Sequence, residues 1–593
     1  MKKIMSHERR DFLQLGVMGA VGATVFPTML LGETQTLSRS PNKLSPSFKP
    51  DVEIELAAET AFIPIIPGRR TKVWRYFGKV IKGHKDSVVN LKGTYLGPIF
   101  NFEQGQKVRI HFINKLPAPC ITHWHGLHVP SAMDGHPMYA IQSGETYVYE
   151  YEILNPAGTS WFHPHTHSVT GKQAYSGLAG LIRIFDKEEE KLDLPRDEFD
   201  IPLIIQDRTF NEKNQLQYLT HPKQAMIGFL GEKILVNGKP NFILEVATRV
   251  YRLRFLNGSN SRIYKLAWDD GTPIDIIGTD GGLLEKPERL PYLMLGPAER
   301  ADVWMDFSGR KKGSELVMKS LDFSGTMPPM YERMKSMHRS DDSESMRKKG
   351  MGGMRGKLRG MMDKMRDSEG LGMMAMTMGI PQGVEFPVFK IRVTRKERED
   401  LVLPKKLVNV RRLLVKDAIN QRNPVPIGIS MKGMKFVLNG EPFKMTGAKD
   451  FETIKLNSVQ LLEIFHDHEM KMEDGETMED MEKENNDDMS QKVSEMNTGG
   501  MGGDMMAMSM AHPIHLHGQQ FQIIKRHPPK QSDGYDSVKD GFLKTGLKDT
   551  VVIMPGEKIT IIKPFEDFKG LFLYHCHNLE HEDMDMMRNF LVI

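Results

Sequence analysis

Four His-x-His pairs constrain the fold of this chain more than any other feature of its sequence. They are His123 and His125, His163 and His165, His515 and His517, and His575 and His577. Side chains alternate across a β-strand, so both histidines of a pair leave the same face of a strand. Imidazole binds copper, zinc, iron and nickel, and eight converging imidazoles indicate a centre with several transition-metal ions. Such a centre requires the two ends of the chain to meet.

Short β-type segments make up much of the remaining chain. The clearest are residues 107–113, 146–151, 251–256, 301–305 and 551–556, with glycine, proline and asparagine between them. No sustained apolar period of a helix separates them, so we expect an all-β fold of β-sandwich domains. Two related phrases, LVNGKPNF from Leu235 and VLNGEPF from Val437, are interpreted as the starts of equivalent domains.

Cys576 indicates which metal is bound. It stands between the two histidines of the last pair and so faces the other side of the strand. His581 and Met586 follow it closely, and His512 precedes the third pair. Two imidazoles, one thiolate and a weak axial thioether form the blue-copper electron-transfer site, so these residues indicate copper.

In identity, order and spacing these motifs resemble those of the multicopper oxidases, and residues 50–593 as a whole resemble the bacterial copper-efflux oxidases of that family. The resemblance implies three consecutive cupredoxin-like Greek-key β-sandwich domains and four copper ions. It implies a type 1 copper on His512, Cys576, His581 and Met586, and a type 2 copper on His123 and His515. It further implies two type 3 coppers, one on His125, His163 and His577 and the other on His165, His517 and His575.

Two carboxylates match the family's proton-supplying acids. Asp134 follows the first histidine pair, and Glu582 follows His581 directly. Their alternative interpretations are a turn aspartate before Gly135 and a surface glutamate. The resemblance implies that they supply protons while dioxygen is reduced to water.

Other histidines and the second cysteine are expected to play lesser parts. His128, His136 and His167 lie out of the ligand register and are interpreted as surface residues or as neighbours of the ligands. His466 and His468 open an acidic segment, where they bind copper transiently or belong to a solvated loop. Cys120 is expected to be a buried free thiol.

The expected organisation begins with an export signal. Arg9 and Arg10 precede a weakly apolar run, Leu13–Leu31, which is similar to a twin-arginine signal, the alternative being a membrane anchor. The predicted segments are the signal at 1–32, a linker at 33–50, and cupredoxin domains at 51–190, 191–400 and 401–593. The protein is thus expected to use the twin-arginine machinery, to work in the periplasm or cell exterior without stable membrane insertion, and to be a monomer.

Two methionine-rich insertions interrupt the second and third domains. Residues 327–378 hold 14 and residues 466–510 hold 11 of the chain's 42 methionines. Neither segment has the apolar side chains to bury itself, and we expect mobile insertions. The second carries 13 acidic residues against 3 lysines. Because thioethers are soft ligands for Cu(I), the hypothesis is that this insertion, with Met508 and Met510 near its end, delivers Cu(I). Met508 stands where the copper-efflux oxidases carry a substrate-site aspartate, which weakens the transfer of their substrate.

These features predict an enzyme that couples four one-electron oxidations at the type 1 copper to the reduction of dioxygen. Cu(I) is the first candidate reductant, with a role in copper tolerance. A laccase-like oxidase of phenols, Fe(II) or Mn(II) is the alternative, and a copper-sequestering protein without turnover is a third. The formal net charge is only +4, without the excess of basic residues that is typical of nucleic-acid-binding proteins, so nucleic acid is not expected as a partner.

Overall fold

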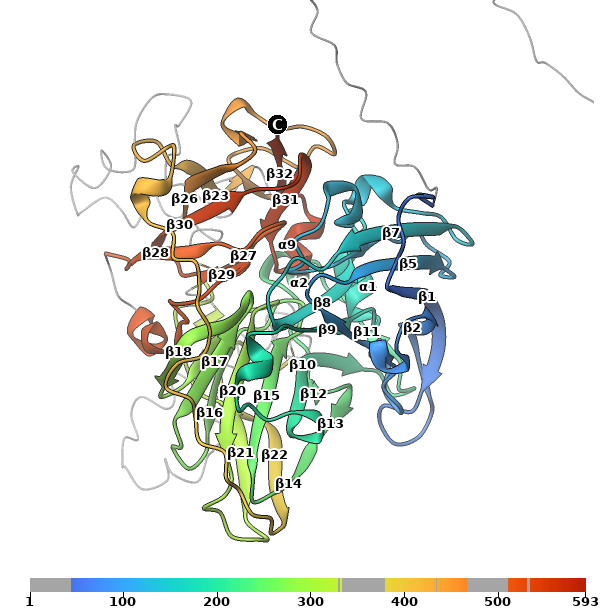
Figure 1. Cartoon of the computed structure of the whole chain (residues 1–593), viewed down its shortest axis with the longest axis vertical. Coiled ribbons are helices and arrows are strands. Elements are labelled where there is room, and N and C mark those ends of the chain that lie inside the picture. Colours follow the sequence, from blue (N-terminus) through green and yellow to red (C-terminus); the bar gives the residue numbers. More distant parts are fainter. Residues whose placement is uncertain (1–43, 329–330, 333–378, 433–434, 467–509, 531–533) are drawn as a thin grey trace, which may run out of the picture. The chain divides into compact units, whose positions relative to one another are not determined.

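The computed structural model describes residues 44–328, 331–332, 379–432, 435–466, 510–530 and 534–593. The predicted export signal, most of the linker, His468, Met508 and nearly all of both methionine-rich insertions lie outside the described residues. The described chain consists mainly of β-strands, which confirms the all-β fold (Figure 1). Its helices include α1 (Thr170–Tyr175), α2 (Pro222–Ile227) and α9 (Leu579–Asp583). In these residues no helix is both long and apolar enough to span a bilayer.

The first region contains two sheets. One has the strand order β2 (Thr71–Lys82), β1 (Val52–Ile63), β5 (Lys107–Asn114) and β7 (Thr146–Glu152). The other has the order β3 (Val88–Val89), β4 (Ile99–Glu103), β9 (Gly180–Phe185), β8 (Gly158–Pro164) and β6 (Thr122–His123).

The second region also contains two sheets. One runs β13 (Lys239–Pro240), β12 (Lys233–Val236), β10 (Asp200–Phe210), β15 (Val250–Asn257), β20 (Arg300–Asp306), β17 (Ile274–Thr279) and β18 (Gly282–Leu290), with β11 (Leu216–Gln217) beside β10. The other runs β14 (Ile243–Ala247), β22 (Phe386–Arg395), β21 (Glu315–Ser320), β16 (Tyr264–Trp268) and β19 (Leu293–Leu295).

The third region repeats the arrangement. One sheet has the order β24 (Lys435–Leu438), β23 (Val425–Lys432), β26 (Ser458–His466), β30 (Lys558–Phe565) and β28 (Gln522–His527). The other has the order β25 (Thr453–Ile454), β32 (Met587–Val592), β31 (Gly570–Cys576), β27 (His512–Leu516) and β29 (Thr550–Ile553).

The three regions share one topology. Each has a parallel pair in its first sheet, namely β1 with β5, β10 with β15, and β23 with β26. Each has another parallel pair in its second sheet, namely β4 with β9, β14 with β22, and β25 with β32. The sheet pairs fall within the three predicted domain ranges, whose boundaries stay predictions.

The two related sequence phrases occupy equivalent hairpins. Asn237 and Asn439 both have a positive φ, of 52°, and each precedes a glycine with positive φ, as a tight hairpin turn requires. The side chain of Asn237 accepts a hydrogen bond from the amide of Ile204 and donates one to a carbonyl of the same strand. Asn439 makes the same two bonds to β23. The equivalence of the two phrases is confirmed, but the interpretation that each phrase starts a domain is wrong, because each follows the first strand of its region.

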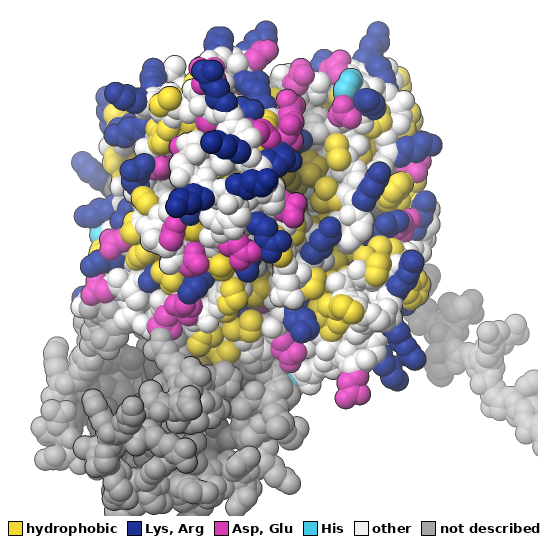
Figure 2. Space-filling view, turned by 90° about the horizontal axis from the view of Figure 1, so that it is seen from below, with side chains coloured by type: hydrophobic (Ala, Val, Ile, Leu, Met, Phe, Trp, Pro, Cys, Tyr) yellow, Lys and Arg dark blue, Asp and Glu magenta, His cyan; other side chains and the backbone are white. Residues whose placement is uncertain are grey.

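Apolar side chains from both sheets of each region form its core. The third region's core includes Ile427, Ile464 and Ile561, and it also takes in Cys576 and Met586. On the face shown in Figure 2, basic and acidic side chains are interspersed with apolar ones.

Candidate metal centre

The four histidine pairs meet on strands from opposite ends of the chain. His123 on β6 lies opposite His163 on β8, and His515 on β27 lies opposite His575 on β31. The second histidine of each pair lies two residues further on, and all eight rings are buried. Contacts between the first and third regions, such as the 3.4 Å from Nε2 of His515 to Nε2 of His123, close the group. The predicted meeting of the two chain ends is confirmed.

The outward nitrogens of several rings are held by the protein. His163, His515 and His575 each donate from Nδ1 to a backbone carbonyl, at 2.9, 2.9 and 3.1 Å. His123 does the same at 2.6 Å. A histidine that binds a metal usually donates its other N–H in this way, which fixes the tautomer and the ring orientation.

The inward nitrogens point at one another. Nε2 of His575 lies 3.2 Å from Nε2 of His165 and 3.1 Å from Nε2 of His517. Burial lowers the pKa of the His163 imidazole to about 3, and it lowers those of His165 and His517 well below their ordinary value. These rings are neutral at pH 7, so lone pairs face lone pairs and a cation between them would relieve the repulsion. Three trios have ligand atoms within 4.8 Å, namely His123, His125 and His515; His125, His163 and His577; and His165, His517 and His575.

A second group surrounds Cys576 on the other side of its strand. Its Sγ lies 3.6 Å from Nδ1 of His512 and 3.8 Å from Nδ1 of His581. Met586 is fully buried in the same core, and its carbonyl accepts the Cys576 amide at 3.0 Å. Burial raises the pKa of the Cys576 thiol, and the amide of Asn578, which donates to Sγ at 3.4 Å, opposes that rise. All twelve predicted ligands thus lie in two buried groups joined by the peptide bonds on either side of Cys576.

Asp134 lies in the turn before Gly135, and its side chain contacts the histidine group. Its Oδ2 accepts a hydrogen bond from Nδ1 of His517 at 2.7 Å, and burial raises the pKa of its carboxyl group. Gly135 has a φ of 85°, and a Cβ there would lie 2.2 Å from the carbonyl oxygen of Thr122. Only glycine lets the turn approach β6 this closely. The turn and the functional interpretation of Asp134 are therefore compatible, since the turn presents the carboxylate to the histidines.

Glu582 is buried, which makes the surface interpretation of this residue wrong. It lies on α9, and its Oε2 is 3.1 Å from Nδ1 of His575 while its Oε1 is 3.6 Å from Nδ1 of His165. Neither carboxylate oxygen has a hydrogen-bond partner among the described residues. A buried, unsatisfied carboxylate beside two candidate ligands is suited to accept and release a proton.

A third buried carboxylate, Asp549, was not identified from the sequence, where no motif marks it. Its Oδ1 lies 3.0 Å from Nε2 of His125, and its backbone carbonyl accepts from His515. Arg300, from the second region, binds both carboxylate oxygens at 2.8 and 2.5 Å, and this pairing holds the Asp549 pKa well below its ordinary value. The second region therefore helps to orient two candidate ligands although it supplies none. Arg300 can be recognised as a partner of Asp549 only from this tertiary contact, because no sequence motif marks it.

The remaining histidines and Cys120 lie outside both groups. His128 contacts Asp567, His136 contacts Asn589, and His167 contacts Asp585, in agreement with their interpretation as neighbours or surface residues. Cys120 is a buried free thiol, as predicted. His466 is the last residue of β26, and it is buried with its ring 5.8 Å from that of His512. The solvated-loop interpretation of His466 is wrong, because strand β26 continues into the core.

A cavity of about 590 Å³ lies beside α9, the helix that carries His581. Residues from α1, α2 and α9 line it, among them Tyr175, Tyr218, Ala225, Asp583 and Met584. His581 itself is covered, because its Nε2 bonds to the carbonyl of Met226 on α2 at 2.9 Å. A molecule bound in the cavity would therefore be separated from the His581 imidazole only by residues of α2 and α9.

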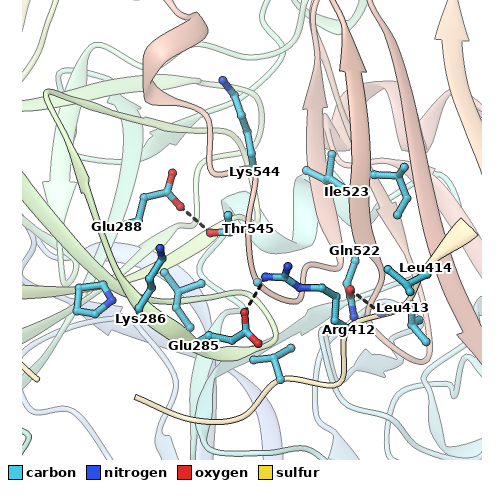
Figure 3. Close-up of a pocket in the computed structure, with 15 residues that line it drawn as sticks. Glu285, Lys286, Glu288, Arg412, Leu413, Leu414, Gln522, Ile523, Lys544 and Thr545 are labelled. Atoms are coloured by element: carbon cyan, nitrogen blue, oxygen red, sulfur yellow. Dashed lines mark hydrogen bonds and ion pairs between the residues drawn. The ribbon is translucent and has the colours of Figure 1, made fainter. Parts of the chain in front are cut away.

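A second hollow, of about 420 Å³, lies between β18 and β28 (Figure 3). Arg412 and Glu285 form an ion pair of 2.9 Å across it, and Thr545 donates to Glu288 at 2.6 Å. None of its lining residues belongs to either histidine group.

Comparisons with known proteins agree with this geometry. Multicopper oxidase models match residues 77–189 and 455–593, which contain all four histidine pairs and Cys576. A laccase of Bacillus stratosphericus is 28% identical, over 91% of this chain and 94% of its own. The crystal structure of the multicopper oxidase McoA from Aquifex aeolicus superposes with a TM-score of 0.65 at 28% identity, covering 92% of this chain and 97% of that one. The cell division protein FtsP of Xenorhabdus nematophila is 33% identical, over 55% of this chain and 66% of its own.

Proposed function

Because the chain belongs to the multicopper oxidase family and is an oxidoreductase of that kind, we propose that its twelve buried ligands hold four copper ions. The type 1 copper is assigned to His512, Cys576, His581 and Met586. The type 2 copper is assigned to His123 and His515, and the type 3 coppers to the two remaining histidine trios. The observation that carries this proposal is the direct peptide linkage of Cys576 to His575 and His577, which joins a thiolate site to a many-histidine site.

The donors fit copper. The group around Cys576 combines two imidazoles with a thiolate and a thioether, which are soft ligands. The other group offers neutral imidazoles alone, with the outward nitrogens held by hydrogen bonds. Copper bound in these sites would supply one-electron oxidation of a substrate at the first and reduction of dioxygen to water at the second.

The chain's own residues connect and shield the two sites. Cys576 shares a peptide bond with His575 on one side and His577 on the other, so an electron needs no diffusible carrier. Phe436 stacks on His581 with ring centroids 4.2 Å apart and helps to keep water from the thiolate. Asp134 at Oδ2 and Glu582 at Oε2 are placed to hold protons beside the histidines.

We favour Cu(I) as the reductant because the described ends of both methionine-rich insertions lie in the core that holds Cys576. Met327, at the start of the first, and Met510, at the end of the second, are buried in the same core as Cys576. The amide of Ala511 donates to the carbonyl of Thr326 at 3.1 Å, which ties the two segments together. Soft thioethers in the same core as the buried Cys576 support a cuprous oxidase with a role in copper tolerance.

The cavity beside α9 favours a second candidate, a laccase-like oxidase of phenols. Its volume of about 590 Å³ lies in the range of small-molecule sites, and Tyr175 and Tyr218 stack in its wall with centroids 4.7 Å apart. The 13 acidic residues of the second insertion offer the hard oxygen ligands that Fe(II) or Mn(II) prefers, so such a substrate belongs to the same alternative. A relative called a laccase supports this second candidate.

Dioxygen consumption by the copper-loaded protein tests both candidates. Chelated Cu(I), Fe(II) and a dimethoxyphenol are supplied at matched concentration. Preferential turnover of Cu(I), lost when Met327 and Met510 are replaced by Leu, supports the cuprous oxidase. Faster turnover of the phenol, reduced by Tyr218→Ala, supports the laccase-like enzyme instead. Absence of oxygen uptake with all three would contradict both and leave copper sequestration.

Export by the twin-arginine route to the periplasm is proposed from the sequence alone. Arg9 and Arg10 before the apolar run support it. Fractionation of cells producing the wild type and an Arg9→Lys, Arg10→Lys variant tests it, since loss of the paired arginines is expected to leave the protein inside the cell.

A further inference from the structure

Helix α9 carries a candidate copper ligand that stands outside the sheets of the third region. His512 and Cys576 lie on the paired strands β27 and β31, so the hydrogen bonds of the sheet fix their positions. His581 lies instead on α9, which has only five residues. A helix this short is not stable without tertiary contacts, because few hydrogen bonds offset the cost of starting it. The position of His581 relative to Cys576 therefore depends on what holds α9.

Glu580 fixes one side of this helix to the second region. Its carboxylate is buried, and each of its oxygens accepts two hydrogen bonds. Oε1 accepts from the hydroxyl of Tyr218 at 2.7 Å and from the side-chain amide of Asn260 at 2.8 Å. Oε2 accepts from the backbone amide of Phe229 at 3.1 Å and from the hydroxyl of Ser261. All these donors belong to the second region, so a single carboxylate ties α9 to three separate segments of that region.

Asp583 fixes the other side of the helix to the first region. Its Oδ1 accepts from the amide of Thr170 at 2.7 Å and its Oδ2 from the amide of Gly171 at 2.9 Å, both at the start of α1. A Cβ at Gly171 would lie 2.4 Å from the hydroxyl oxygen of Tyr218, so glycine lets α1 come this close. The side chain of Asn260 also donates to the carbonyl of Gly171, at 3.0 Å. The contacts of all three regions thus meet at α9.

The imidazole of His581 is held in the same way. Its Nδ1 lies 3.8 Å from Sγ of Cys576, and its Nε2 donates to the carbonyl of Met226 on α2 at 2.9 Å. The amide of Leu579 donates to the carbonyl of Asn260 at 3.1 Å, which adds a backbone contact with the second region. A displacement of α9 would therefore change the approach of this imidazole to the thiol sulfur. Groups that orient a metal ligand commonly change metal affinity by about 10- to 100-fold.

We propose that Glu580 and Asp583 are positioning residues of the type 1 site. Together they hold α9 between the second and the first region, and so they set the approach of the His581 imidazole to Cys576. The second region supplies none of the twelve assigned ligands, but it contributes to this site through the groups that bind Glu580. The inference rests on the proposed function, because it concerns the binding of the type 1 copper.

Glu580→Gln and Asp583→Asn test this proposal, with Asp302→Asn as the matched control. Each amide keeps the shape of the carboxylate it replaces but turns an NH₂ group toward hydrogen-bond donors. Asp302 is also a buried carboxylate, and it accepts from Arg252 and Arg254 on the neighbouring strand β15 of the second region. All three variants lose hydrogen bonds of a buried carboxylate, but only the first two lose them at α9.

Three quantities are measured for each protein. They are the visible absorption of the copper-loaded form, the affinity for the type 1 copper in competition with a chelator, and hydrogen exchange of peptides from α9 in the metal-free form. Glu580→Gln and Asp583→Asn should each shift the absorption and bind the type 1 copper about 10- to 100-fold more weakly. Their α9 amides should exchange about 10-fold faster, because hydrogen bonds to a charged group are lost. Asp302→Asn should unfold at lower urea concentration but keep the wild-type absorption and affinity.

The outcomes separate the two proposals. Wild-type absorption, copper affinity and α9 exchange in both α9 variants would overturn the role of the two carboxylates. An equal loss of affinity in Asp302→Asn would also overturn it, because the effect would then follow from general destabilisation. A wild type that lacks the intense visible absorption would overturn the assignment of the type 1 copper itself. Hydrogen exchange in the metal-free protein would still decide whether Glu580 and Asp583 hold α9.

Discussion

Replacing Lys563 by Met should stabilise the metal-free protein at low pH. This lysine lies near the end of β30, and burial lowers the pKa of its amine to about 7 in the folded chain from an ordinary value of 10.5. The unfolded chain therefore binds more protons between these values, and the stability of the wild type rises with pH across that window. From pH 6 to pH 9 the gain corresponds to about two pKa units, or about 2.5 kcal/mol. Met has no titratable proton, so the free energy of unfolding of Lys563→Met does not change in this way. The stability advantage of the variant over the wild type should therefore be smaller at pH 9 than at pH 6 by that amount.

Urea-dependent hydrogen exchange of peptides from β30 measures this effect. The five tryptophans lie between residues 74 and 304, so fluorescence does not report on the third region. The difference in free energy of opening between Lys563→Met and the wild type is taken at pH 6, 7.5 and 9. Lys548→Met is the matched control, because a lysine paired with two carboxylates stays charged throughout and its loss should destabilise equally at each pH. A difference for Lys563→Met that is constant from pH 6 to 9 would refute the reasoning.

Three further changes test other parts of the site. Glu582→Gln should slow oxygen reduction about 100-fold without changing the anaerobic bleaching of the type 1 copper, because a proton holder beside His575 is lost; equal slowing of both steps would contradict this role. Arg300→Met should lower the free energy of unfolding in urea by about 3 to 5 kcal/mol, because Asp549 is left as a buried charge without a partner cation. Arg310→Met, at a half-exposed ion pair, should lower it by less than about 1 kcal/mol. The metal-free protein should lose stability as pH falls below about 6.5, because histidines of the unfolded chain take up protons before buried ones such as His163 do. Each such histidine should lower the free energy of unfolding by up to about 2 kcal/mol by pH 5. Bound copper should reduce this loss, and a urea midpoint that does not change with pH would exclude the mechanism.

The ligands could be predicted from the sequence because strand geometry is local. Alternation along a strand puts His575 and His577 on one face and Cys576 on the other, whatever the rest of the fold does. The hairpins at Asn237 and Asn439 were predictable for the same reason, since a positive φ before glycine is a local requirement.

The groups around the ligands could not be predicted in this way. Arg300 reaches Asp549 from another region, and the side chain of Lys563 is buried against the carbonyl of Gln519, 44 residues earlier in the chain. An arginine or lysine on a strand is most often a solvated residue, so neither side chain differs in sequence from its exposed neighbours. His466 was interpreted as part of a solvated loop because it stands beside an acidic segment, but it is buried at the end of β26.

Copper content measured together with oxygen uptake tests the central claim most directly. The account predicts four copper ions per chain in the wild type and four electrons taken from substrate per dioxygen consumed. In Cys576→Ser it predicts three copper ions, no intense visible absorption and no substrate-driven oxygen uptake. Fewer than four ions in the active wild type, or a Cys576→Ser variant that keeps its colour and turnover, would contradict the assignment of these twelve ligands.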